Sequence, residues 1–244
     1  MFLVSCISIL VSYFVPDKYE SSILLVEAES SSGSSQLSEL SGLAGIAGIP
    51  LPTGETNNAE LGIEIFQSRK FTSDFIERRD ILIPLFASSG WNKSTKELVI
   101  DNNIYNESKN KWNWSSSYSE SKKPQRNEAY DYWTKEIFSI NEDKKTGFVR
   151  ISIKHYSPYL ASNWAEWIVE DLNNYIREID VKEAELALEF LNNELLKDHP
   201  KELKELFYKL VQANIEKKML AYSQSEYVFK VVDSSYVPDK RISP

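Results

Sequence analysis

The sequence predicts an α+β fold in which a small mixed sheet, packed with helices, carries a very long helix and a helical hairpin. Apolar residues recur at helical spacing from Pro158 to about residue 222, with no glycine and only Pro200 to interrupt them. Shorter β-branched and aromatic segments occur on both sides of this stretch. A third observation, an uncharged apolar run over residues 1–15, predicts part of a transmembrane helix at the N-terminus.

Composition excludes several classes of function. The 244 residues allow one large domain or two small ones, with 28 basic and 36 acidic side chains and a net charge of −8. Such an acidic chain lacks the basic surface of a nucleic-acid-binding protein. One cysteine rules out an internal disulfide, and two histidines leave little for a histidine-based metal site or catalytic triad. We therefore expect no cofactor, no metal and no nucleic-acid partner.

The N-terminal run ends at Pro16 and Asp17. A helix that crosses a bilayer needs roughly 20 apolar residues, so this run is a few residues short. A signal peptide would begin with positive charge and end at a small-residue cleavage site, and neither is present. We interpret residues 1–15 as the second half of a transmembrane helix; a buried core helix is the alternative. Residues 16–244 then form one domain, with a helical arm over about 158–222.

The first elements of that domain are a strand and an apolar loop. Residues 18–27 predict a strand, and a serine-rich stretch follows over 30–38. Residues 43–52 are small and apolar, and Gly42, Gly45 and Gly48 recur at intervals of three from just before this stretch. A phosphate-binding loop would need a Gly-Lys-[Ser/Thr] ending or a GxGxxG motif that enters a helix, and neither occurs. The segment predicts a loop packed by its own side chains, or alternatively a surface for subunit or membrane contact.

Helices and polar segments fill the next part of the chain. Asn57 and Asn58 can cap a helix from Ala59, and helical spacing continues over 68–79. Residues 81–86 are apolar and contain Pro84. The polar stretch 91–127 carries Trp112, Trp114 and Tyr118. We expect these aromatic rings to half-cover a core edge; stacking on sugars or nucleobases beside Lys122, Lys123 and Arg126 is the alternative.

The second half of the domain begins with strands and continues as long helices. After a short helix from Glu128, residues 136–140 and 147–154 predict two strands, and the second alternates as in a sheet with one covered face. Ser157 suits an N-cap and Pro158 the first turn of a helix of about 40 residues, roughly 60 Å long. A second helix restarts after Pro200 and predicts an antiparallel hairpin or a bent rod.

The acidic residues of the first long helix admit two interpretations. Nine carboxylates lie between Glu166 and Glu194. A charge run on a helix is typical of a solvated face, which we favour over paired catalytic carboxylates. Residues 227–233 predict a last strand, which must end before Pro238 because proline cannot donate to a ladder.

The order of these features resembles the chain-length determinant (Wzz) family of polysaccharide co-polymerases. The similar stretches, in chain order, are Pro16–Leu25, Leu37–Gly48, Ser68-Arg69-x-Phe71 with Phe75-Ile76, Lys144–Gly147 through His155-x-Ser157-Pro158 to Ala161 and Asn173, Met219–Ala221, Tyr227–Phe229, Val232-Asp233, Val237-Pro238 and Ser243-Pro244. No single motif is specific, but their order is. Relative to the family pattern, the first membrane anchor is short and the second is missing.

The resemblance implies a non-catalytic protein of the bacterial inner membrane whose main domain lies in the periplasm. The family forms ring-like homo-oligomers and sets the modal length of a lipid-linked polysaccharide, such as the O-antigen of lipopolysaccharide. The implied partners are a second copy of the chain, the O-antigen polymerase, the lipid-linked polysaccharide and the membrane. The residues that carry the family motifs, none of them catalytic, are Pro16, Tyr19, Gly45, Gly48, Ser68, Arg69, Phe71, Gly147, Ser157, Pro158, Asp233, Pro238 and Pro244.

Two other functions stay open from the sequence. The first is an adaptor in capsular polysaccharide export, which shares the co-polymerase domain. The second is a periplasmic carbohydrate-active enzyme, suggested by six tryptophans and many carboxylates. Such an enzyme needs two carboxyl groups at a defined separation across a cleft.

Overall fold

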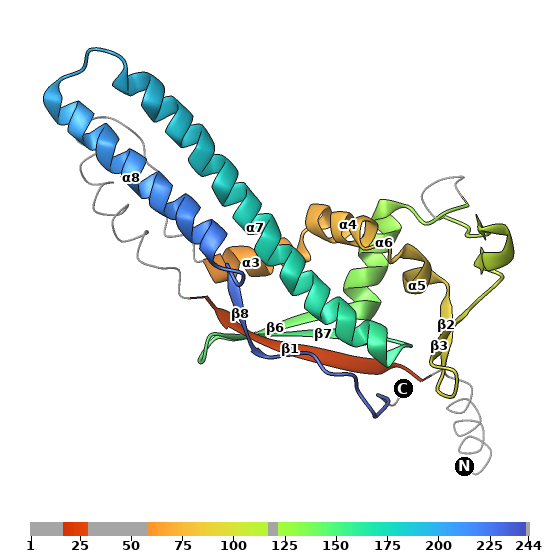
Figure 1. The fold of residues 1–244 in the computed structure, drawn as a ribbon. Coiled ribbons are helices and arrows are strands. Elements are labelled where there is room, and N and C mark those ends of the chain that lie inside the picture. The colour runs from red at the N-terminus through yellow and green to blue at the C-terminus, as the bar shows by residue number, and fades with distance from the viewer. Residues whose placement is uncertain (1–16, 29–57, 117–121, 243–244) are drawn as a thin grey trace, which may run out of the picture. The chain divides into compact units, whose positions relative to one another are not determined.

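The computed structural model describes residues 17–28, 58–116 and 122–242 (Figure 1). These residues divide into two compact units. The first unit contains residues 17–26, 63–116, 122–169 and 231–242, and the second contains 27–28, 58–62 and 170–230. The predicted transmembrane segment over 1–15 lies outside the described residues. Within the described part of the chain, no helix has both the length and the apolar composition to cross a membrane.

A four-stranded sheet with the order β6-β7-β1-β8 forms one side of the first unit (Figure 1). Its strands are β6 (Phe138–Asp143), β7 (Phe148–His155), β1 (Tyr19–Glu27) and β8 (Phe229–Asp233). The pairings of β7 with β6 and with β1 are both antiparallel. Ile23 lies opposite Ile151, and every second residue of β1 from Tyr19 to Leu25 is buried. The predicted sheet with one covered face is confirmed.

Aromatic residues from several elements form the core of this unit. The helices α4 (Arg69–Arg78) and α6 (Arg126–Tyr132), a π-helical turn over Trp133–Ile137 and the start of α7 (Pro158–Leu195) contribute to it. The Trp133 and Trp164 ring centroids lie 5.8 Å apart. Other large aromatic side chains buried here include Phe66, Phe71, Phe75 and Phe138.

Several boundaries differ from the prediction. Helical spacing over 59–79 suggested continuity, but Ser68 separates α3 (Asn58–Gln67) from α4 because its hydroxyl accepts the Phe71 N–H as an N-cap. The strand expected from residue 136 starts at Phe138, after the π-helical turn. Pro84 lies inside the short helix α5 (Leu82–Phe86).

The polar stretch after residue 87 contains two small hairpins that we did not predict. They pair β2 (Ser88–Asn92) with β3 (Glu97–Ile100), and β4 (Tyr105–Asn106) with β5 (Lys111–Trp112). The Asn92 side chain accepts the N–H groups of Ser94 and Thr95 and so forms the first turn.

The tryptophans of this stretch pack on aromatic neighbours. Trp112 contacts Tyr105 with ring centroids 5.0 Å apart, and Trp114 contacts Phe86 at the same distance. The indole N–H of Trp114 also donates to Glu128 at 3.3 Å. The prediction that these rings half-cover a core edge is therefore confirmed for the two tryptophans, while Tyr118 lies outside the described residues.

The second unit is an antiparallel helical hairpin of the later part of α7 and α8 (Lys201–Ser223) (Figure 1). Helix α7 has 38 residues and α8 has 23. At about 1.5 Å per residue, α7 is roughly 57 Å long. Near the turn, four buried apolar residues lock the helices together: Leu191, Leu206, Phe207 and Leu210.

Candidate functional site

The start of the longest helix is fixed by its own first residues and by the strand before it. The Ser157 hydroxyl accepts the Leu160 N–H at 3.3 Å, and Pro158 is the first helical residue, as predicted. The Ser157 N–H donates to Nδ1 of His155 at 3.0 Å. Nδ1 therefore carries no hydrogen, and Nε2 donates to the carbonyl oxygen of Pro84 at 3.0 Å. Tyr19 lies opposite His155 in the sheet register.

His155 is held in its neutral form. Its ring is buried against Trp164, with centroids 4.6 Å apart. Desolvation by burial lowers the pKa of His155 to about 4, although both of its backbone hydrogen bonds act in the opposite direction. Both ring nitrogens are occupied by backbone groups, so this histidine ties β7, α5 and α7 together.

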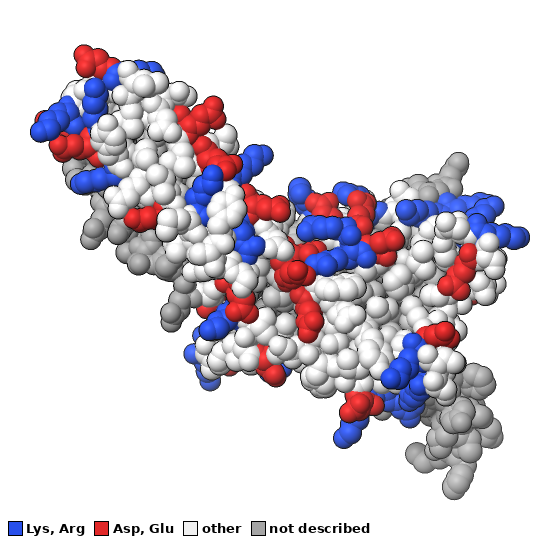
Figure 2. All heavy atoms as spheres, viewed as in Figure 1, with Lys and Arg blue, Asp and Glu red and all other residues white. Residues whose placement is uncertain are grey.

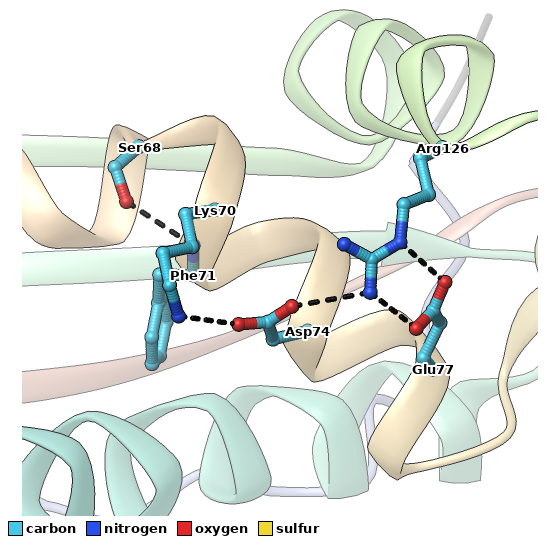
Figure 3. A network of polar contacts seen from close by, with 6 residues as sticks. All are labelled: Ser68, Lys70, Phe71, Asp74, Glu77 and Arg126. Carbon is cyan, nitrogen blue, oxygen red and sulfur yellow. Dashed lines mark hydrogen bonds and ion pairs between the residues drawn. The ribbon is translucent and has the colours of Figure 1, made fainter.

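A polar network joins α4 to α6 on the surface of the first unit (Figure 3). The guanidinium of Arg126 donates from Nε to Glu77 at 2.6 Å and from Nη2 to Asp74 at 3.3 Å, and Nη2 also bonds the second oxygen of Glu77. Lys70 donates to Asp74 at 2.8 Å from one turn earlier on α4. Beside this network, Arg69 lies over the Tyr130 ring, 4.6 Å from its centroid.

The network keeps its acids ionised. Hydrogen bonding to Arg126 lowers the pKa of Glu77, and hydrogen bonding to Lys70 lowers the pKa of Asp74. Hydrogen bonding to Glu77, together with the charges of Glu77 and Asp74, raises the pKa of Arg126. A glycosidase needs one carboxyl group with a raised pKa to donate a proton, so Glu77 and Asp74 are unsuited to that role.

A cleft of about 290 Å³ opens beside this network. Its lining includes Glu77 and Asp80 from one side and Lys123 and Arg126 from the other, over an apolar floor that includes Ile76. The charges of these four side chains balance. Among the described residues, no group of three or more histidine, cysteine, aspartate or glutamate side chains is placed to hold a metal ion.

The two ends of the described chain meet in the first unit. The Ile242 N–H donates to the Lys18 carbonyl oxygen at 2.9 Å, and Arg241 donates to Asp17 at 2.6 Å. After β8 the chain runs on without helix or strand, and Pro238 is buried. The prediction that the last strand ends before Pro238 is confirmed, since β8 stops at Asp233.

Buried polar contacts close the open end of the hairpin in the second unit. The Asn173 side-chain oxygen accepts the N–H groups of Val228 and Phe229 at 2.8 and 3.0 Å, and its amide donates to the Phe229 carbonyl at 3.0 Å. Arg177 donates to the carbonyl oxygens of Gln224 and Ser225 just beyond α8. These bonds hold the segment after α8 against α7.

Ion pairs link the facing surfaces of α7 and α8. Lys217 lies 2.8 Å from Asp180, and Lys218 lies 2.6 Å from Glu185. Figure 2 shows basic and acidic side chains interspersed along this hairpin and over α4 and α6. Part of the acidic stripe of α7 therefore pairs with lysines of α8, and Asp171 is buried, so the prediction of a wholly solvated face is only partly right.

The predicted site residues occupy several places. Ser157 and Pro158 form the start of α7, and Tyr19 lies opposite His155, whose Nδ1 accepts the Ser157 N–H. Ser68, Arg69 and Phe71 form the start of α4. Gly147 lies in the turn before β7 with a φ of +73°, a conformation that favours glycine. Asp233 ends β8, and Pro238 follows it in the chain. The remaining predicted residues lie outside the described part: Pro16, Gly45, Gly48 and Pro244.

Sequence reasoning missed the polar network and the role of His155. Arg126 lies 49 residues from Glu77, and a local sequence pattern does not indicate an ion pair between residues so far apart in the chain. His155 carried one usable signal: it stands two residues before an N-cap serine, where its Nδ1 can accept that serine's N–H.

Comparisons with known proteins give little beyond this geometry. No family model matches the chain, and no curated protein sequence does. Among solved structures, the chain is similar to one described as a fragment of WzzB, a polysaccharide co-polymerase from Salmonella Typhimurium. The TM-score is 0.35 and the identity 16%, over 93% of this chain and all of the other.

Proposed function

We propose that this chain is a non-catalytic regulator of polysaccharide chain length, acting as an oligomeric scaffold at the bacterial inner membrane with its main domain in the periplasm. The observation that carries the proposal is the contact between the two ends of the described chain. The pairing of Lys18 with Ile242 and of Asp17 with Arg241 brings residues 17–18 and 241–242 side by side. Ends that lie close together suit a domain that loops out from one face of a membrane.

The long hairpin supports the same proposal. In the sequence resemblance, the stretch from His155 to Pro158 marks the junction between the sheet and the long helix. The described chain has its strand β7 and helix α7 at these positions, joined by the Ser157 N-cap. A helix of 38 residues, braced by ion pairs to α8, supplies a rod of fixed length. Our proposed mechanism is that copies associate side by side, and that the growing glycan or its polymerase samples a surface whose extent the rod sets.

Complementation tests the proposed function. The complete gene should be expressed in a strain that lacks its own chain-length determinant, and the lipopolysaccharide ladder should be resolved on a gel. We expect a preferred cluster of bands to return, because the scaffold limits the length of the glycan. A ladder that stays unregulated while the protein accumulates in the membrane would contradict the proposal. If the gene instead restores capsule export in a strain that lacks its export adaptor, without changing this ladder, the export adaptor is favoured.

A further inference from the structure

The second unit carries an apolar groove between its two helices. Leu188 of α7 and Ile215, Met219 and Tyr222 of α8 line a hollow of about 560 Å³, with Lys218 and Ser223 beside them. The three α8 residues follow one another at intervals of four and three, so they share one face of that helix.

The apolar side chains of this groove are unusually open to solvent. Met219 is 66% exposed, Tyr222 is 68% and Ile215 is 48%. The charged side chain in the lining, that of Lys218, donates to Glu185 at 2.6 Å. A contiguous apolar surface of this kind commonly marks a contact with another segment or another molecule. We therefore expect a specific apolar segment or molecule to cover the groove.

The chain itself contains a segment with matching chemistry. Residues 43–51 read Leu-Ala-Gly-Ile-Ala-Gly-Ile-Pro-Leu and carry no charge. They lie between the described residues Ala28 and Asn58. The N–H of Ala28 donates to the Val228 carbonyl oxygen at 2.8 Å. On the other side, Gly62 packs so closely on Phe229 that an added Cβ would lie 2.6 Å from the Phe229 ring.

Both attachments lie next to the end of α8 that carries the groove. Val228 and Phe229 follow Ser223, the last residue of α8, by five and six residues. The seven residues from Leu51 to Asn58 span up to about 23 Å at roughly 3.3 Å each. The groove from Tyr222 to Ile215 is seven helical residues long, or about 10 Å. The tether is thus about twice as long as the groove.

We propose that residues 43–51 dock into the groove of their own chain, where their leucine and isoleucine side chains cover Ile215, Met219 and Tyr222. Tethering at both ends makes the docking intramolecular, and a short tether gives an effective concentration on the order of millimolar. A second copy of the chain has no such advantage at low concentration. This inference does not depend on the proposed function.

Disulfide cross-linking in the full chain tests the docking. With Cys6→Ser as background, Ile46→Cys is combined with Met219→Cys, or with Tyr222→Cys as a second groove position. The matched control combines Ile46→Cys with Tyr208→Cys, because Tyr208 is 62% exposed on α8 but lies eleven residues from Met219, about 16 Å along the helix. The tether from residue 46 to 58 could span about 40 Å, so its length does not restrict residue 46 to the groove. A difference in disulfide rate between the groove positions and Tyr208 therefore reports docking.

Mild oxidation should form an intrachain disulfide with Met219→Cys and Tyr222→Cys at least about tenfold faster than with Tyr208→Cys. Peptide mass spectrometry identifies the bond, and mixing isotopically labelled with unlabelled chains distinguishes bonds within a chain from bonds between chains. Circular dichroism should show the same helix content for every variant. Two results would overturn the proposal directly: equal rates at all three positions, or no disulfide at the groove. Disulfides found only between labelled and unlabelled chains would also overturn it, because they would assign the groove to a second copy.

Discussion

Acidification should destabilise the first unit through His155. The imidazole is buried and neutral, with a pKa of about 4 against the ordinary value of 6.5. Between these two values the unfolded chain binds a proton that the folded chain does not, so stability falls as the pH falls through this window. At about 1.4 kcal/mol per pKa unit, the loss between pH 7 and pH 5 is about 2 kcal/mol. Below a pH of about 4 no further loss comes from this residue.

Urea denaturation at pH 8, 7, 6 and 5 measures this loss. A variant with His155→Asn keeps a side-chain acceptor near the Ser157 N–H but cannot titrate, so its stability should be lower throughout yet lose about 2 kcal/mol less between pH 7 and 5. Carboxylates titrate in both proteins, and the difference between the two slopes isolates the histidine. Between pH 8 and 7 the two slopes should agree. An equal slope in both proteins from pH 7 to 5 would refute the assignment of a buried neutral imidazole.

Three further perturbations test other contacts. Asn173→Ala should lower the free energy of unfolding by about 2–4 kcal/mol, because it leaves the buried N–H groups of Val228 and Phe229 without their acceptor; an unchanged urea midpoint would contradict this contact. Gly147→Ala should cost about 1 kcal/mol, since its φ is +73° and the space around it is open; Gly90→Ala, at a negative φ, is the control for the loss of a glycine. Arg126→Gln should lower the melting temperature slightly, and the difference should shrink in 1 M salt because the pairs are exposed; a large, salt-independent drop would argue against it.

The elements that could be predicted are those specified by neighbouring residues. Ser157 and Pro158 predict the start of α7 because capping needs only the first turn. The alternation of Val149, Ile151 and Ile153 predicts the buried face of β7 because side chains on a strand alternate between faces.

The features that escaped prediction depend on contacts between distant segments or on exceptions to a pattern. Ser68 separates two helices whose apolar residues keep a continuous helical spacing, so periodicity hides the break. The strand Ser88–Asn92 is polar and lacks the alternation of apolar and polar residues that predicts a strand. Arg126 meets Glu77 and Asp74 only after α4 and α6 pack together. The spacing of residues along the chain therefore does not predict such contacts.

The length of the hairpin is the quantity that tests the central claim most directly. Removing residues 186–192 from α7 and 207–213 from α8 takes two turns, about 10 Å, from each helix. Duplicating the same two segments lengthens each helix by the same amount and serves as the matched control. In the complemented strain, we predict that the modal length of the lipopolysaccharide shifts in opposite directions for the two variants. An unchanged ladder, with both variants folded and assembled in the membrane, would contradict the account.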